Sequence, residues 1–244
     1  EPVEIGPDEA SCLKVRQADD FRNIRVVTPH LPRDLSEDQR EEALKDLLDA
    51  HVGKCARPLI AWYYTPMMLP FSRHLDASAV VYDCMDELSK FRFAPERLLD
   101  LEQELIERAD LVITGGASLY EAKKSRHGNV HCFPSSVDRD HFAKARRELP
   151  QPADQAELEH PRLGFYGVID GRLDLDLLRQ PADMRPNWSF VMVGPVVKIG
   201  EDELPRAANI HYLGGKTYEH LPAYLSGWDV AMMPFAMNES TQFI

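Results

Sequence analysis

Residues 96–114 read ERLLDLEQELIERADLVIT, and this stretch decides the fold. Its apolar side chains recur at helical spacing and predict a helix over residues 95–109 with one apolar face, made by Leu98, Leu99, Leu101, Leu105 and Ile106. The apolar, β-branched run Leu111–Thr114 follows directly and predicts a strand. Helices and strands in such close succession are typical of βαβ units, in which the strands of a sheet run parallel.

The same alternation extends on both sides of this stretch. Helical patterns occur at about residues 37–54, 66–75, 118–126, 174–180 and 218–227. Short apolar runs predict further strands at Ile24–Thr28, Leu59–Tyr64, Ala79–Asp83, Val130–Phe133, Leu163–Val168, Phe190–Val193, Ile210–Leu213 and Val230–Pro234. The sequence therefore predicts an α/β protein with parallel sheets.

The composition changes near Leu149. Residues 148–161, ELPQPADQAELEHP, are rich in proline and acidic residues and lack an apolar period, which predicts a surface linker. We expect a first lobe over residues 1–148, a linker over 149–160 and a second lobe over 161–244. The chain opens on a loop-like segment and closes soon after a predicted strand, so we expect a fragment whose second lobe is incomplete.

Composition excludes several classes of protein. The 244 residues carry a net charge of −12, with 28 Lys and Arg against 40 Asp and Glu, which argues against nonspecific nucleic-acid binding. The four cysteines and nine histidines lack the spacings of a zinc site, so no metal is expected. No apolar run of 18 residues and no secretory signal is visible, which favours a cytoplasmic protein.

Carboxylates follow the strand predicted at Ala79–Asp83. Asp83 and Asp86 lie within the run Asp83-Cys84-Met85-Asp86-Glu87 and should reach the carboxyl edge of the sheet, where open α/β sheets bind ligands. A carboxylate there can act as a general base or bind sugar hydroxyls. A solvated loop that caps the next turn explains the same residues equally well.

Glycines and cations follow the first two strands of the second lobe. Gly167 and Gly171 allow close backbone approach, and Arg172 beside them can bind a phosphate through two hydrogen bonds. Lys198, after the next strand, should lie at the same edge. Ordinary surface cations are the alternative for both basic residues.

Six segments, in this order, resemble bacterial GT-B glycosyltransferases of the retaining glycosyltransferase 4 group. They are VVYDCMDELSKF, ADLVITGGASLYEAKK, VHCFPSSVDRDHF, RLGFYGVIDGRLD, FVMVGPVVKI and NIHYLGGKTYEHLPAYLSGWDVAMMPF. The resemblance runs from about Ile24 to the end of the chain. It implies a GT-B-like fold of two Rossmann-type lobes with parallel sheets that face a cleft, and an enzyme that needs no metal.

The resemblance also implies roles for individual residues. Arg172 matches the arginine that contacts the donor diphosphate, and Gly167 and Gly171 match its loop. Asn238 and Glu239 lie near the position where relatives contact the donor sugar. Lys198 is expected on the same donor side.

The resemblance is incomplete on the acceptor side and at both ends. Asp83 falls near a strand end where relatives place an acceptor-side or catalytic group, often histidine, so aspartate departs from the pattern there. The opening strand with its glycine loop and the late glutamate that binds the donor ribose or sugar have no counterpart in the chain.

The predicted function is transfer of a sugar from a nucleoside diphosphate sugar to a saccharide or lipid-linked acceptor, retaining and metal-independent. A GT-B sugar-nucleotide epimerase, which needs no acceptor, and a noncatalytic GT-B-like binding module are the alternatives. The donor is a substrate, and no other cofactor and no nucleic acid is expected. A peripheral position at the inner membrane stays open, because the clusters Lys123-Lys124-Ser125-Arg126 and Arg146-Arg147 are short.

Overall fold

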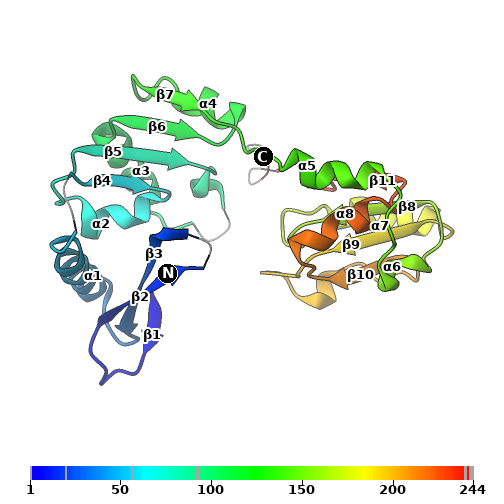
Figure 1. The fold of residues 1–244 in the computed structure, drawn as a ribbon, viewed down its shortest axis with the longest axis horizontal. Coiled ribbons are helices and arrows are strands. Elements are labelled where there is room, and N and C mark those ends of the chain that lie inside the picture. Colours follow the sequence, from blue (N-terminus) through cyan, green and yellow to red (C-terminus); the bar gives the residue numbers. More distant parts are fainter. Residues whose placement is uncertain (1, 20, 56–57, 92–93, 239–240, 242–244) are drawn as a thin grey trace. The chain divides into compact units, whose positions relative to one another are not determined.

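The structure is a computed structural model that describes residues 2–19, 21–55, 58–91, 94–238 and 241. The chain divides into two compact units, unit 1 (Glu1–Pro134) and unit 2 (Ser135–Ile244) (Figure 1). Among the described residues, no helix is long and apolar enough to cross a membrane.

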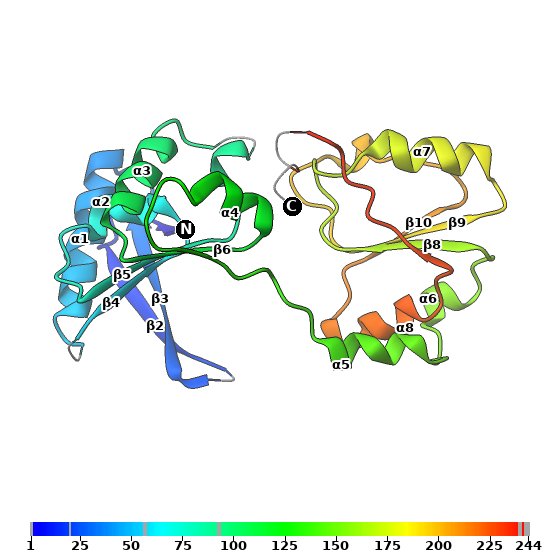
Figure 2. The same cartoon turned by 90° about the horizontal axis from the view of Figure 1, so that it is seen from above.

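Unit 1 is built on a parallel four-stranded sheet. Its strand order is β4 (Ile60–Tyr63), β5 (Ala79–Cys84), β6 (Leu111–Thr114) and β7 (Val130–Cys132). The connections run through the 3-10 helix η1 (Pro66–Met68) and α2 (Leu69–Ser72), then η2 (Leu88–Lys90) and α3 (Leu98–Arg108), then α4 (Ala117–Lys123). Figure 2 shows α3 and α4 on the same side of this sheet.

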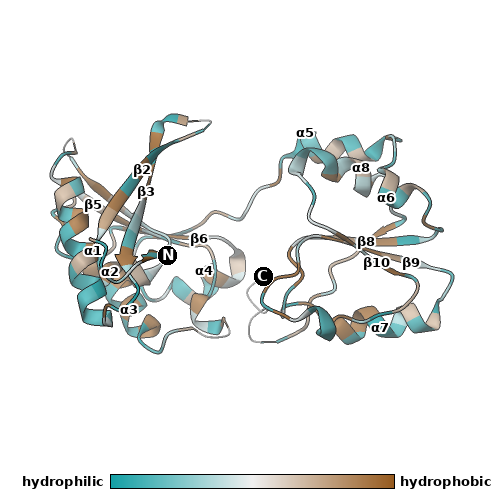
Figure 3. Cartoon of the chain, turned by 90° about the horizontal axis from the view of Figure 1, so that it is seen from below, coloured by the Kyte–Doolittle hydropathy of each residue, from teal (hydrophilic) through white to brown (hydrophobic). Residues whose placement is uncertain are grey.

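The helix that the opening stretch predicts is present as α3. Leu98, Leu101, Leu105 and Ile106 are buried as the period requires, whereas Leu99 is 58% exposed and does not belong to the apolar face. The first helix of the chain among the described residues, α1 (Glu37–Val52), is mostly hydrophilic along its surface (Figure 3). Its start is fixed by Ser36, whose hydroxyl accepts from the Gln39 N–H at 3.3 Å while the Gln39 side chain accepts from the Ser36 N–H at 2.9 Å.

The strand predicted at Ile24–Thr28 is present within a longer strand, but the segment before it is not the loop that the sequence predicts. This segment and that strand form a separate three-stranded sheet of order β1 (Val3–Ile5), β3 (Phe21–Pro32) and β2 (Cys12–Ala18). The strands β2 and β3 pair antiparallel over most of their length and form a long hairpin. The loop prediction was wrong because charged residues alternate with apolar ones in a strand that is open to water, and this pattern has little net hydrophobicity.

Unit 2 contains a second parallel sheet. Its order is β10 (Ile210–Gly214), β9 (Ser189–Val193), β8 (Arg162–Tyr166) and β11 (Val230–Ala231). In Figure 2, α7 (Leu175–Met184) covers one side of the sheet, and α5 (Arg139–Phe142), α6 (Ala153–Ala156) and α8 (Leu221–Leu225) cover the other. The short 3-10 helices η3 (Ala143–Arg146), η4 (Glu201–Glu203) and η5 (Tyr218–His220) complete the unit. Its main core contains Phe165, Leu178, Phe190 and Met192.

The boundary between the units lies earlier than residue 148. The segment 135–148 belongs to unit 2 because α5 and η3 pack against α8. Residues 149–160, expected as a linker, pack onto the same unit, and Gln155 within them is fully buried. Arg162, 4% exposed, fixes this segment by donating to the carbonyl oxygens of Ala156 at 3.0 Å and Leu158 at 2.5 Å.

Candidate functional site

The loops after β8 and β9 approach each other closely at the carboxyl edge of the unit 2 sheet. Gly167 and Gly194 both have φ of +150°, a conformation that side chains rarely adopt. A Cβ on Gly194 would lie 1.7 Å from the carbonyl oxygen of Gly167, and the Gly167 N–H donates to the Val193 carbonyl at 2.9 Å. Glycine is therefore required at position 194 for the two loops to meet.

Replacement of Gly194 by alanine is expected to lower the free energy of unfolding by about 1–3 kcal/mol from backbone strain alone. The clash with Gly167 should add to that cost. Gly171→Ala is the matched control, because a Cβ there meets only Ile199 Cγ2 at 4.0 Å and the φ of Gly171 is ordinary. Urea unfolding of the full chain measures both variants, and equal stability of the two would contradict the assignment.

Asp170 orients Arg172 at the same edge. Its carboxylate accepts from the Arg172 Nε at 2.9 Å and from the Arg172 backbone N–H at 3.0 Å, and the Arg172 Nη2 lies 2.9 Å from Oδ2. The Arg172 side chain keeps 36% of its surface exposed, whereas Asp170 keeps 15%. The carboxylate thus fixes the direction of a guanidinium that still reaches solvent.

The sequence-predicted residues Gly171, Arg172 and Lys198 come together in unit 2. Ile169 pairs with Val196 as an isolated parallel bridge, so the loop after β8 lies alongside the loop after β9. Lys198 follows in this second loop, is exposed and has a φ of +64°. Two cations thus stand on neighbouring loops at one sheet edge.

The segment after β11 lies beside the Arg172 loop. The Ala236 N–H donates to the Arg172 carbonyl at 2.9 Å, and Leu173 pairs with Phe235. Asn238 follows two residues after Ala236, and its backbone N–H donates to Thr241 Oγ1 at 3.1 Å. Glu239 lies outside the described residues.

Aromatic side chains near the ends of β8 and β10 were not singled out from the sequence. Tyr166, 38% exposed, ends β8 and stacks on Phe142 with a centroid distance of 5.7 Å. Tyr218, 46% exposed, follows β10 and stacks on His141 at 4.2 Å. The sequence offers only one signal for them: Tyr166 is the last residue of β8, and Tyr218 lies in the segment that follows β10.

In unit 1, the two predicted catalytic carboxylates differ in exposure. Asp83 is 8% exposed, and its Oδ2 accepts from the Trp62 indole N–H at 3.2 Å. Its Oδ1 is buried and has no hydrogen-bond partner among the described residues. Asp86, in the loop after β5, is exposed. Asp86 is therefore the carboxylate of this pair that solvent reaches.

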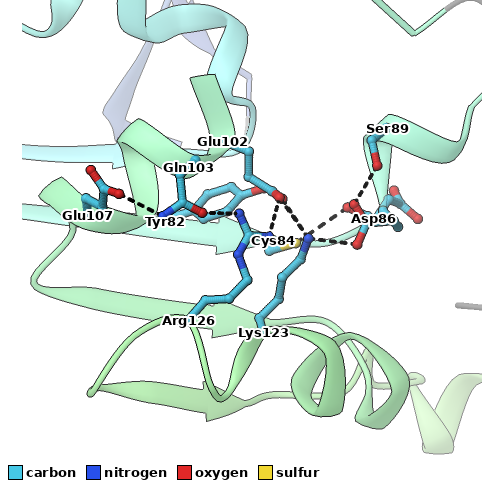
Figure 4. A network of polar contacts seen from close by, with 10 residues as sticks. Tyr82, Cys84, Asp86, Ser89, Glu102, Gln103, Glu107, Lys123 and Arg126 are labelled. Atoms are coloured by element: carbon cyan, nitrogen blue, oxygen red, sulfur yellow. Dashed lines mark hydrogen bonds and ion pairs between the residues drawn. The ribbon is translucent and has the colours of Figure 1, made fainter. Parts of the chain in front are cut away.

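Glu87, the third carboxylate of that run, forms an ion pair with Lys123 and so belongs to the buried ionic network around Glu102 and Lys123 that Figure 4 shows. Lys123 Nζ lies 2.7 Å from Glu87 Oε2 and 2.8 Å from Glu102 Oε1, and both its side chain and that of Glu102 are 3% exposed. Arg126 and the Tyr82 hydroxyl also donate to Glu102, at 2.7 Å and 3.0 Å. The network joins α3 and α4 to the loop after β5, so its role is to hold that loop in place.

Burial changes the ionisation of two neighbours of this network. It raises the pKa of the Cys84 thiol to about 11 and raises the pKa of the Tyr82 hydroxyl as well. Both groups are therefore neutral and unreactive near pH 7. Within the described part of the chain, no group of His, Cys, Asp and Glu side chains is arranged to hold a metal ion.

The chain is similar in sequence to the putative teichuronic acid biosynthesis glycosyltransferase TuaH of Bacillus subtilis (strain 168). The two are 27% identical over 201 residues, which cover 75% of this chain and 50% of TuaH. The chain spans about half the length of the curated relative it matches. No protein-family model matches the chain.

Solved structures share its fold. Sucrose-phosphate synthase from Thermosynechococcus elongatus superposes with a TM-score of 0.60 at 18% identity over 96% of this chain and 66% of its own. Anabaena HepE in complex with UDP gives 0.58 at 15% identity over 83% and 59% of the two chains, and TarM gives 0.53 at 10% identity over 79% and 39%. The predicted GT-B-like α/β fold is confirmed.

Proposed function

We propose that the chain acts as a cytoplasmic glycosyltransferase. It would move a sugar from a nucleoside diphosphate sugar to a saccharide or lipid-linked acceptor. The observation that carries this proposal is the Arg172 guanidinium, which Asp170 orients at the carboxyl edge of a parallel sheet. An arginine fixed in this way can bind a phosphate at two oxygens. The complex of HepE with UDP, a protein of the same fold, supports a nucleotide donor.

The residues of unit 2 would bind the donor. Arg172 and Lys198 would neutralise the charge that develops on the diphosphate as it leaves, which favours a metal-independent reaction. The loops of Gly167 and Gly171 would bring backbone N–H groups close to the phosphates. Asn238 and Glu239 would contact the donor sugar.

The residues of unit 1 would serve the acceptor. Asp86 is exposed and is the better placed of the two carboxylates to bind or deprotonate an acceptor hydroxyl. Asp83 would act more indirectly, since its Oδ2 is already hydrogen-bonded to Trp62. Retention of the anomeric configuration is part of the proposal and follows from the resemblance to the retaining group.

A thermal-shift titration of the full chain with UDP, GDP and their common sugars tests the proposal. One nucleotide is expected to raise the melting temperature by about 5–11 °C at a hundredfold excess over its Kd, because a ligand that binds only the folded state adds about 2.7 kcal/mol there. The protein is then incubated with the nucleoside diphosphate sugar of the nucleotide that binds, with and without a saccharide acceptor, and the products are identified. Absence of any shift, or a new sugar nucleotide formed without acceptor, would overturn the transferase proposal.

A further inference from the structure

The β2–β3 hairpin carries a cluster of cations on one of its faces. The register pairs Lys14 with Thr28 and Cys12 with His30, and Arg16 lies two residues beyond Lys14 on the same strand. Because alternate residues of a strand share a face, Lys14, Arg16, Thr28 and His30 stand on one side of the hairpin, here called the basic face. Figure 3 shows the hairpin extending away from the main sheet of unit 1.

The basic face contains a hollow of about 510 Å³, which is within the range of small-ligand sites. Its lining is Lys14, Val15, Arg16, Thr28 and His30. Ammonium, guanidinium, hydroxyl and imidazole groups are hydrogen-bond donors, and the lining contains no carboxylate. A ligand that carries an oxyanion suits this set of donors.

The charge of the hairpin contrasts with that of the rest of the chain. Residues 12–28 contain four cations and two acids, whereas the whole chain has a net charge of −12. Neither Lys14 nor Arg16 forms an ion pair with any residue that the structure describes, although Arg40, Arg97 and Lys123 in the same unit all do. Two exposed cations without an acidic partner attract an anion from solution.

We infer that this hollow binds the carboxylate or phosphate of an acidic saccharide. Lys14 and Arg16 would bind the oxyanion, and Thr28 and His30 would hydrogen-bond ring hydroxyls. The inference rests on the proposed function in one respect, the use of a saccharide acceptor. The hairpin would hold an acidic acceptor chain by a group other than the one that reacts.

Binding of tetragalacturonate to the full chain, followed by isothermal titration calorimetry at low salt, tests the inference. Arg16→Gln is expected to raise the Kd about tenfold, because a hydrogen bond between charged groups contributes about 1.5 kcal/mol. Arg25→Gln is the matched control, since Arg25 is exposed on the same hairpin but pairs with Gln17 on the opposite face. It should change the Kd less than about twofold. Maltotetraose, the neutral tetrasaccharide, should bind at least about tenfold more weakly than tetragalacturonate.

Three results would overturn the inference. The first is an equal loss of affinity for tetragalacturonate in Arg16→Gln and Arg25→Gln. The second is a Kd for maltotetraose equal to that for tetragalacturonate. The third is binding to vesicles of 30% phosphatidylglycerol in phosphatidylcholine without binding to tetragalacturonate. The nucleotide titration separates this inference from the proposed function. Binding of a nucleotide without binding of tetragalacturonate would support the proposed function and contradict the hairpin site. Binding of tetragalacturonate without binding of any nucleotide would support the hairpin site and contradict the proposed function.

Discussion

Replacement of Lys123 by methionine is expected to lower the free energy of unfolding of unit 1 by about 3–5 kcal/mol. Lys123 lies between two buried carboxylates, and Glu102 keeps a second cationic partner in Arg126 after the change. Among the residues that the structure describes, Glu87 then keeps only the Ser89 hydroxyl, which donates to its Oε1 at 2.8 Å. The Glu87 carboxylate, whose side chain is 9% exposed, would then be a buried charge without a cationic partner. The cost of burying that charge accounts for the size of the expected loss.

Hydrogen exchange of the full chain measures this loss locally, in the amides of β5 and α3. Lys124→Met is the matched control, because Lys124 is the adjacent residue, is 47% exposed and pairs with Glu121 on the surface. The control should leave exchange in β5 and α3 unchanged. Similar exchange in both variants would show that the buried network does not hold the loop after β5.

The same network predicts how stability depends on pH. Burial acts to raise the pKa of Glu102, but the hydrogen bonds from Lys123 and Arg126 outweigh it and lower that pKa below the ordinary value of 4.5. The folded state therefore binds its proton more weakly than the unfolded state, so this stabilisation is present above about pH 4.5 and is lost as the pH falls through the folded-state pKa. In Lys123→Met, the free energy of unfolding of unit 1 should therefore fall less steeply as the pH is lowered below about 4.5 than it does in the unchanged protein.

Patterns local in the chain predicted the fold well. The stripe around Leu101 and Leu105 and the apolar run at Leu111–Thr114 were enough to predict α3 and β6, because burial of one helix face and of whole parallel strands leaves a clear period. Of the hairpin, the sequence predicted only Ile24–Thr28 within β3, and β2 with its antiparallel pairing was missed. The hairpin is held by backbone hydrogen bonds between its strands. Because these bonds do not depend on side-chain type, the sequence gives no signal for them.

The candidate site was predictable in part for a similar reason. Gly167, Arg172 and Lys198 follow strands directly, so topology alone brings them to one sheet edge. The role of Glu87 was not predictable, since its partner Lys123 lies in a later helix and reads as part of a surface cluster of cations. The orientation of Arg172 by Asp170 also needed the structure, because the same spacing fits an extended loop in which the two side chains diverge.

Replacement of Arg172 by alanine is expected to raise the Kd for the nucleotide that binds by about 10- to 100-fold. A charge-assisted hydrogen bond contributes about 1.5–3 kcal/mol, and the variant loses the group that would make it. Arg172→Lys should recover only part of this affinity. An ammonium is a point donor and cannot keep the fixed contact with Asp170 while it binds two phosphate oxygens.

Arg179→Ala is the control that separates this effect from a general change of charge in unit 2. Arg179 is 55% exposed on α7 and pairs with Asp176 at 2.7 Å, three residues earlier in the same helix. Both variants remove one positive charge from the same unit, so long-range attraction of the nucleotide falls by a similar amount in each. A loss confined to Arg172→Ala, with an unchanged melting temperature of the free protein, therefore reports a direct contact with the phosphates. Equal Kd values for the two variants would show that the phosphates bind elsewhere.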